Sequence, residues 1–309
     1  MMVRKILLAT ALVAASAVAA QAAEPENCKT VRIADVGWTD NTAQNGLFKT
    51  VLKGLGYTPE DQVLALPVIM EGLKNKDLDI FLDNWMPSNA ANVQPYLDAK
   101  TLDMLGANLT GAGYGPVVPD YVAAGGVKDV KDLAKFADKF DKKFYGIEPG
   151  NDGNKIVQAK IDDPANGLQG WEMVESSEQG MLAQAQASIQ NQEWIAFLGW
   201  TPHPVMGKMK LVYLTGFEND GFGDAQIKTL TRPGYSAECA NVGKLLGNLK
   251  FDLAMESAIM SAIDGGAEGE KASAEWLKAN PGVLDSWLAG VTTVDGQDGG
   301  PAVKKSLGL

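Results

Sequence analysis

Apolar runs alternate with helical patterns along the first third of the chain. The runs have the length and composition of buried strands, and they cover residues 31–36, 63–66 and 78–82. The segments between them, 42–53 and 69–74, repeat apolar residues at helical spacing. Strands that alternate with helices in this way predict a parallel sheet with helices on its faces.

Two glycine-rich stretches, at 111–116 and 216–223, interrupt this pattern. Glycine permits unusual backbone angles and proline fixes one of them, so we interpret both stretches as crossovers that can act as hinges. The sequence between the crossovers predicts helices at 130–140 and 178–192 and strands at 144–147 and 195–198. From about Ala237 onwards the pattern is mostly helical.

The crossovers divide the chain into two lobes, as its length also suggests. Residues 23–112 and 217–309 form a discontinuous lobe I, and residues 113–216 form lobe II. The expected fold class is therefore α/β, with two lobes, parallel-type sheets flanked by helices, and a ligand cleft between the lobes.

Residues 1–22 have the features of a secretory signal peptide. Two basic residues precede the apolar stretch 6–20, and the tripeptide at 20–22 fits a small-residue cleavage site. The apolar stretch is short for a membrane span, and the residues before Cys28 are polar, unlike those at a lipoprotein cleavage site. We expect an exported protein that is cleaved and carries no lipid anchor.

The chain has two cysteines, Cys28 and Cys239. Exported proteins usually pair their cysteines in an oxidising compartment. A disulfide between them would tie the start of the mature chain to the second segment of lobe I. The alternative is a pair of free, buried thiols.

The formal net charge of −11 argues against nucleic acid and anionic membranes as partners. It favours the approach of a cationic ligand, although solubility explains an acidic surface equally well. Signals for catalysis are poor, because His203 is the only histidine and no G-x-S-x-G, P-loop or dinucleotide motif is present. We expect no enzymatic activity, no metal site and no cofactor.

Four aromatic residues stand among glycine, proline, aspartate and asparagine: Trp38, Trp85, Tyr114 and Trp200. Each of the three tryptophans follows an apolar run, and ligands of open α/β sheets bind just beyond the carboxyl ends of strands. Several aromatic faces together can surround an organic cation, at roughly 0.5–2 kcal/mol per contact. The alternative for any single tryptophan is a place in the core.

Two polar residues lie close to these aromatics. Asp40 could attract a cation, but it could equally cap the helix expected to begin near Thr42. The amide of Asn151 could orient a hydroxyl group, but the segment around it could also be a turn and a helix N-cap.

Six short motifs resemble the substrate-binding proteins of ABC importers for glycine betaine, choline and related quaternary amines, and within that family the periplasmic choline-binding proteins. They are VGWTD (36–40), GLKNKDLD (72–79), DNWMP (83–87), GYGP (113–116), EPGND (148–152) and GWTPHP (199–204). In this order, after a signal peptide, they extend the resemblance over nearly all of the mature chain.

This resemblance implies a two-lobed type II binding-protein fold that closes on its ligand by hinge motion. It implies that Trp38, Trp85, Tyr114 and Trp200 form a box around a trimethylammonium group, while Asp40 and Asn151 hold the hydroxyl of choline. It also implies a periplasmic monomer that passes its ligand to the membrane permease of an ABC importer.

The ligand's tail separates choline from glycine betaine. The choline hydroxyl can donate to Asp40, whereas an ionised Asp40 would repel the carboxylate of betaine. We therefore favour choline, with acetylcholine and betaine as alternatives. If Asp40 only caps its helix, the argument against betaine no longer holds. An exported choline-ester hydrolase is a further alternative, against which the lone histidine counts, and delivery to a chemoreceptor is another.

Overall fold

The computed structural model describes residues 24–217 and 219–309. The signal peptide expected at 1–22 lies outside these residues. Within the described ranges, no helix is both long enough and apolar enough to span a bilayer.

The strands all join one mixed sheet. They are β1 (Thr30–Asp35), β2 (Thr58–Val63), β3 (Ile80–Met86), β4 (Asp103–Pro119), β5 (Lys143–Tyr145), β6 (Glu172–Val174), β7 (Phe197–Thr201), β8 (Leu211–Tyr213) and β9 (Gly223–Thr231). Their order is β2-β1-β3-β9-β4-β7-β5-β6, with β8 on β4. The pairs at both ends of the sheet are parallel, and all pairs that involve β4 or β9 are antiparallel.

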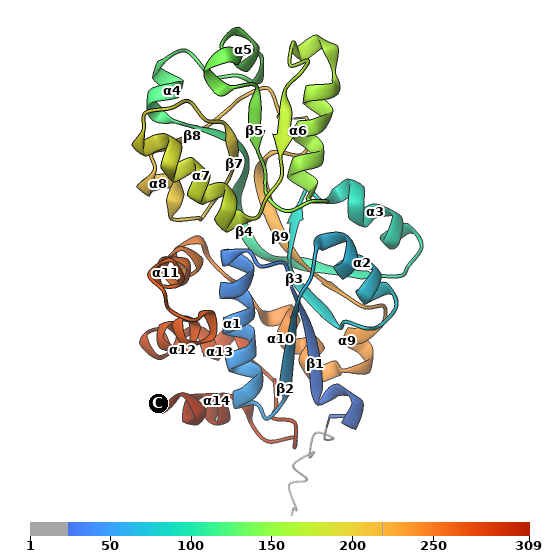
Figure 1. Ribbon diagram of the computed structural model, residues 1–309. Helices are drawn as coiled ribbons and strands as arrows, with labels where there is room; N and C mark the ends of the chain where they lie inside the picture. The colour runs from blue at the N-terminus through green and yellow to red at the C-terminus, as the bar shows by residue number, and fades with distance from the viewer. Residues whose placement is uncertain (1–23, 218) are drawn as a thin grey trace, which may run out of the picture.

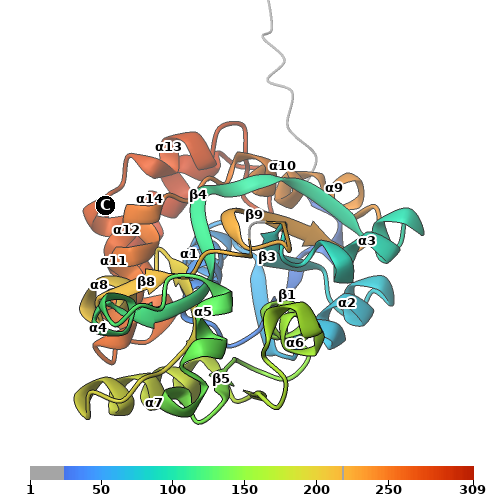
Figure 2. The same cartoon turned by 90° about the horizontal axis from the view of Figure 1, so that it is seen from above.

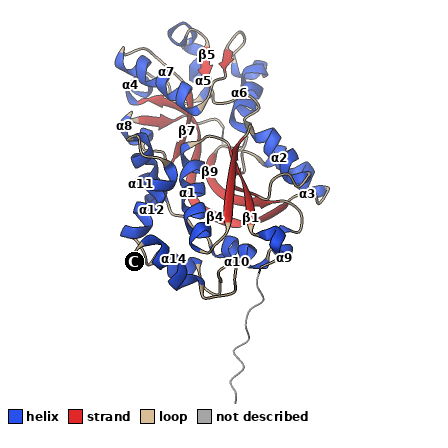
Figure 3. Cartoon of the chain, turned by 60° about the horizontal axis from the view of Figure 1, so that its bottom comes forward, coloured by secondary structure: helices blue, strands red, loops and turns tan. Residues whose placement is uncertain are grey.

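Helices cover the sheet on the outside (Figure 3). They are α1 (Thr39–Gly54), α2 (Leu66–Lys74), α3 (Ala90–Asp98), α4 (Asp120–Ala124), α5 (Val130–Lys135), α6 (Asp152–Asp162), α7 (Glu178–Gln190), α8 (Val205–Lys208), α9 (Tyr235–Glu238), α10 (Ala240–Asn248), α11 (Leu253–Asp264), α12 (Gly269–Ala279), α13 (Val283–Trp287) and α14 (Gly299–Leu307). Three short 3₁₀ helices cover Glu26–Cys28, Ala137–Phe140 and Pro164–Asn166.

The elements gather in two lobes (Figure 1). The lower lobe holds β1–β3, α1–α3 and α9–α14, and the upper lobe holds α4–α8 with β5–β8. Seen from above, α10–α14 lie along one side of the lower lobe and α2 and α3 along another (Figure 2). The C-terminal helices therefore return to the lobe that contains β1, and this matches the expected two-lobed α/β class.

The strands β4 and β9 connect the lobes, where the sequence suggested glycine-rich crossovers. The stretch 111–116 lies inside β4, so this crossover is part of a long strand and not a separate loop. Gly111 has a φ of +80° and stands where the register of β4 and β9 shifts between Thr110 and Ala112. The glycine thus marks a bulge in a long strand. The residue-level lobe boundaries, 23–112, 113–216 and 217–309, stay a prediction.

Several strand bounds differ from those expected. The strand expected at 63–66 is β2, at 58–63, an exposed edge strand whose polar sequence gives no apolar run. The strand β3 continues to Met86 and β7 continues to Thr201. Trp85 and Trp200 therefore lie within strands, and only Trp38 lies in a loop beyond a strand.

A disulfide joins Cys28 and Cys239, which confirms the expected pair. The two residues are 211 positions apart, and both are fully buried. The bond fixes the first turn of the described chain to the segment between α9 and α10. Covalent closure of so long a loop removes conformational freedom mainly from the unfolded chain.

Candidate functional site

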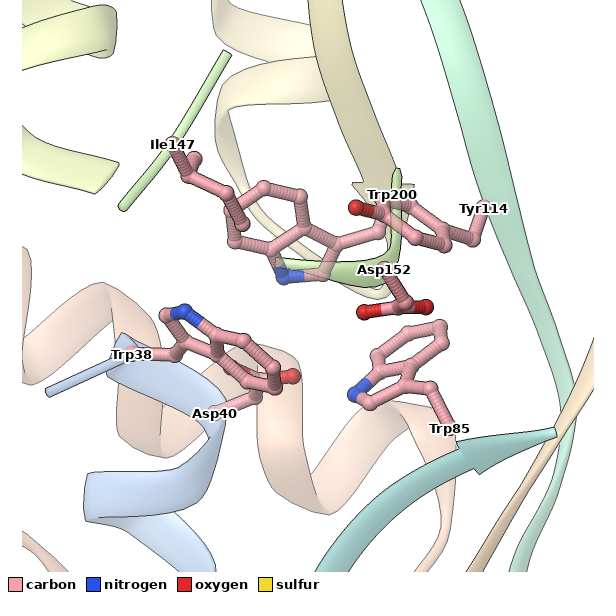
Figure 4. Close-up of a pocket in the computed structure, with 7 residues that line it drawn as sticks. All are labelled: Trp38, Asp40, Trp85, Tyr114, Ile147, Asp152 and Trp200. Carbon is pink, nitrogen blue, oxygen red and sulfur yellow. The ribbon is translucent and has the colours of Figure 1, made fainter. Parts of the chain in front are cut away.

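A cavity lies between the lobes. Its walls contain four large aromatic side chains, one isoleucine and two aspartates (Figure 4). They are Trp38, Asp40, Trp85, Tyr114, Ile147, Asp152 and Trp200. The structure thus brings together five of the six ligand-binding residues expected from the sequence, and it adds two others.

The four aromatics come from four elements. Trp38 immediately precedes α1 and Trp85 lies near the end of β3. Tyr114 of β4 and Trp200 of β7 are partners in the antiparallel register, so both side chains emerge on the same face of the sheet. All four side chains are at least nine-tenths buried.

The rings meet at steep angles around the cavity. The ring centroids of Tyr114 lie 5.6 Å from Trp85 and 6.3 Å from Trp200, with interplanar angles of 57° and 81°. Phe222 packs edge-on against Tyr114 at 5.0 Å and supports it. Tilted rings present several faces towards one enclosed volume, which is the geometry that binds an organic cation.

Asp40 points into this cavity and does not cap a helix. The helix α1 begins at Thr39 with Trp38 as its N-cap, so the expectation of a start near Thr42 with Asp40 as the cap is wrong. Asp40 is 1% exposed, and within the described residues neither of its carboxylate oxygens has a hydrogen-bond partner. Burial, and after it the negative charge of Glu178, raises the pKa of Asp40 to about 7.

Asn151 caps α6, as the alternative interpretation of its segment expected. Its Oδ1 accepts hydrogen bonds from the backbone N–H groups of Gly153 (2.7 Å) and Asn154 (3.2 Å) and from the Tyr114 hydroxyl (3.2 Å). A Cβ at position 153 would come within 2.1 Å of that hydroxyl, so only glycine permits this contact. Asn151 does not line the cavity; it holds the ring of Tyr114.

Asp152 and Ile147 line the cavity without having been predicted to do so. Asp152 is the first residue of α6 and is 3% exposed, and its Oδ2 has no hydrogen-bond partner in the described part of the chain. Burial raises its pKa. An aspartate after an N-capping asparagine is common at helix starts, so the sequence contained no signal that distinguished it.

Three side chains of the upper lobe bind the loop before α1 and close the cavity. The indole N–H of Trp38 donates to Glu148 Oε2 at 2.9 Å. The backbone N–H of Thr39 donates to Glu178 Oε2 at 2.8 Å, and its hydroxyl donates to Glu178 Oε1. Gln179 Nε2 donates to the carbonyl of Gly37 at 3.2 Å. These bonds cross between the lobes, so the structure represents a closed arrangement.

His203 supports the most buried of these contacts. Its Nδ1 accepts from the backbone N–H of Val205 (3.2 Å), so its Nε2 carries the proton and donates to Glu178 Oε1 at 3.1 Å. Both side chains are about 2% exposed. The lone histidine therefore orients Glu178 towards α1 and does not reach the cavity wall.

Two more buried acids lie beside α1 on the lower lobe. Gln44 Nε2 donates to Asp83 Oδ1 at 3.2 Å and to Glu256 Oε1 at 2.9 Å. Burial, and then the charge of Asp40, raises the pKa of both Asp83 and Glu256. Asp40 thus faces a negative environment, and a cation in the cavity would relieve it.

The family of the chain follows from a match over most of its length. The family model of the substrate-binding domain of ABC-type glycine betaine transport systems matches residues 29–279. The chain belongs to this family. The match includes every cavity-lining residue and Cys239 of the disulfide, and it begins one residue after Cys28.

Known members of the glycine betaine transport family and solved structures are similar to this chain. An ABC-transporter choline-binding protein in complex with choline is 48% identical, with a TM-score of 0.89, over 92% of this chain and 100% of that one. Lactococcal OpuAC, closed on glycine betaine, is 26% identical with a TM-score of 0.76, over 84% and 98%. The glycine betaine/carnitine transport binding protein GbuC of Listeria monocytogenes is 29% identical over 54% of this chain and 55% of its own.

Membership of the family confirms the resemblance and the fold class expected from the sequence. The neighbours have the type II periplasmic binding-protein fold, and this chain has the same mixed α/β architecture. The family consists of substrate-binding proteins of transport systems and is not an enzyme family. Substrate-binding proteins of ABC importers work in the periplasm.

Proposed function

We propose that this protein binds choline in the cavity between its lobes and delivers it to the membrane permease of an ABC importer. The protein is exported to the periplasm, and its signal peptide at 1–22 is removed. The observation that carries the proposal is a closed cavity with four aromatic walls and two carboxylates. Of the described residues that line it, none is lysine or arginine. The 48% identity to a choline-binding protein that was solved with choline supports the same ligand.

The aromatic rings provide the site for the trimethylammonium group. This group has no N–H to donate, so a protein holds it through ring faces, whose quadrupoles attract positive charge. Trp38, Trp85, Tyr114 and Trp200 surround the cavity from both lobes. At roughly 0.5–2 kcal/mol per face, more when water is excluded, four faces together contribute about 2–8 kcal/mol to binding.

Asp40 is the group that recognises the tail. Its buried oxygens have no partner among the described residues, and the choline hydroxyl can donate to one of them. A carboxylate tail in the same position would face Asp40 and, beyond it, the buried acids Asp83 and Glu256. The desolvated like charges would repel, so the cavity favours an alcohol over an acid.

Ligand binding and lobe closure are linked in this proposal. The cavity walls come from both lobes, and the two carboxylates come one from each lobe, Asp40 from α1 and Asp152 from α6. A cation between them contributes contacts that only the closed arrangement provides, and such differential contacts shift the population towards closure. The strands β4 and β9, which pass between the lobes, are where the hinge lies.

Isothermal titration of the oxidised protein tests the proposal. The protein is first unfolded and refolded to remove any carried ligand, and choline and glycine betaine are titrated separately at pH 8. We expect choline to bind at least a hundredfold more tightly, because the repulsion of a carboxylate exceeds about 2.7 kcal/mol. Equal or stronger betaine binding would move the protein to the betaine-binding part of the family. No heat with either ligand would refute the proposed cage.

Glycine betaine is the second candidate ligand because of one hydrogen-bond donor in the cavity wall. The indole N–H of Trp200 is buried and has no acceptor within the part of the chain that the structure describes. An N–H donor suits a carboxylate oxygen, although it also suits the oxygen of the choline hydroxyl. The titration described above separates these ligands, and acetylcholine belongs in the same series.

Choline affinity is expected to depend on pH through Asp40. The pKa of Asp40 is raised to about 7 by burial and by Glu178, and a cation binds the ionised form more tightly. Lowering the pH from 8 to 5 should therefore weaken binding, by up to about tenfold per unit below pH 7. Titrations at each half unit measure this, and Asp40→Asn is the control that should flatten the profile.

The same group affects stability with the opposite sign. The folded protein holds the Asp40 proton more tightly than the unfolded chain does, since the pKa rises from 3.8 to about 7. The free energy of unfolding of the ligand-free protein therefore loses this contribution as the pH rises through that window. For the affinity prediction, the contradicting result is a choline Kd that does not change between pH 8 and pH 5, which would show that Asp40 does not face the ligand.

A further inference from the structure

The proposed function leaves the second carboxylate of the cavity, Asp152, without a hydrogen-bonding role. Asp152 is 3% exposed, lines the cavity, and points among the aromatic side chains (Figure 4). Its Oδ2 is fully buried and accepts no hydrogen bond in the described residues. A buried carboxylate oxygen without a donor is costly, so the site contains an acceptor that awaits a donor.

Choline cannot satisfy both acids. Its hydroxyl is its single donor, and a quaternary nitrogen has no N–H. Asp40 of the lower lobe has two fully buried oxygens without partners, and Asp152 of the upper lobe has one. With choline bound, one of the two acids attracts the cation by charge alone. A ligand with a second donor would satisfy both acids.

We propose that Asp152 is a specificity-determining acceptor for an N–H⁺ group, and that the cavity also binds protonated tertiary amines with a hydroxyl tail. Dimethylethanolamine is the simplest member of this class. The inference rests on the proposed function, since it uses the same cage and the same recognition of the tail by Asp40. It extends the ligand range from quaternary to tertiary ammonium ions.

Local structure fixes the direction of the Asp152 side chain. Asn151 caps α6 through Gly153 and Asn154, so the backbone at position 152 is set by the start of a regular helix. Burial raises the pKa of the Asp152 carboxylate, and the nearby Ser88 hydroxyl and first N–H groups of α6 partly offset that rise. The carboxylate is thereby oriented before a ligand arrives.

The exchange of one methyl group for a proton has two opposing effects. The tertiary amine loses the contact of that methyl group with the aromatic walls. It gains a hydrogen bond in which both partners are charged, and such bonds are about twice as strong as neutral ones. Among the described residues that line the cavity there is no lysine or arginine, so no side-chain cation inside the cavity competes for Asp152.

Titration of the full-length mature protein with choline and with dimethylethanolamine at pH 7 tests the inference. We expect dimethylethanolamine to bind within about tenfold of choline in the natural sequence. In Asp152→Asn, which keeps the shape of the side chain, the dimethylethanolamine/choline ratio of Kd should rise roughly tenfold. In the matched variant Asp40→Asn both ligands should weaken, and their ratio should stay within threefold.

The outcomes separate the two proposals. Failure of choline itself to bind overturns the proposed function and this inference with it. Tight choline binding, with dimethylethanolamine more than tenfold weaker or with a ratio that changes less than threefold in Asp152→Asn, overturns the inference alone. If thermal unfolding without ligand shows that Asp152→Asn does not fold, Asp152→Ser replaces it, because serine also favours a helix start and its shorter side chain withdraws the acceptor.

Discussion

Replacement of Trp85 by alanine is expected to weaken choline binding by at least a hundredfold. The indole is 5% exposed and forms one wall of the cavity, where its centroid lies 5.6 Å from the ring of Tyr114. Its removal takes away a cation–π contact of roughly 0.5–2 kcal/mol and a large desolvated face, and it lets water reach the cation. A hundredfold loss corresponds to about 2.7 kcal/mol.

Two further variants are compared with Trp85→Ala by isothermal titration, one conservative and one a control. Trp85→Phe keeps a ring in the wall and should lose less, about tenfold, because phenylalanine has the weaker quadrupole. Trp194→Ala is the control for the loss of an indole, since Trp194 packs on Phe136 and Lys139 away from the cavity. Its choline affinity should not change. If Trp85→Ala folds and binds choline within tenfold of the natural protein, the aromatic wall does not hold the cation.

Replacement of Asp40 by asparagine is expected to weaken choline binding roughly 10- to 100-fold at pH 8 and to leave betaine binding equal or stronger. The change removes the negative charge and keeps the volume of a side chain that is 1% exposed. A hydrogen bond to a charged group contributes roughly 1.5–3 kcal/mol, which gives the size of the choline loss. The repulsion that disfavours betaine disappears with the same charge.

The readout is the ratio of the two dissociation constants, because it cancels any general loss of closure. Asp138→Asn is the charge-matched control, since Asp138 is exposed on the upper lobe and its removal tests the overall field alone. Its choline/betaine ratio should equal that of the natural protein. An unchanged ratio in Asp40→Asn would remove Asp40 from tail recognition and return the role to the aromatic walls.

The aromatic cage could be predicted from the sequence, but the reason for its geometry could not. Trp38 was expected beyond a strand, and it lies there, but Trp85, Tyr114 and Trp200 lie inside strands. Periodicity places strand ends poorly when a strand extends from the core into polar residues, as β3 does through Asp83 and Asn84.

The polar parts of the site were harder to predict. Asp40 was found because it stands next to Trp38, whereas Asp152, Glu178 and Glu256 gave no signal that distinguished them from surface acids. These acids differ from surface acids only in being buried. Their burial depends on contacts between segments more than a hundred residues apart, such as Thr39 with Glu178. Long-range contacts of this kind cannot be obtained from local patterns. The disulfide could be predicted because the chain has only two cysteines and an exported protein usually pairs its cysteines in an oxidising compartment.

The Cys28–Cys239 disulfide and the pairing of β3 with β9 together set an order of assembly as the chain is synthesised. The strand β3 pairs with β9, and Cys28 awaits a partner 211 residues later, so the lower lobe stays incomplete until most of the chain has been made. At a synthesis rate of about 5–20 residues per second, this interval is roughly 10–40 s. The upper lobe, between the two segments, is finished earlier. The thiol of Cys28 therefore waits for its partner throughout that interval.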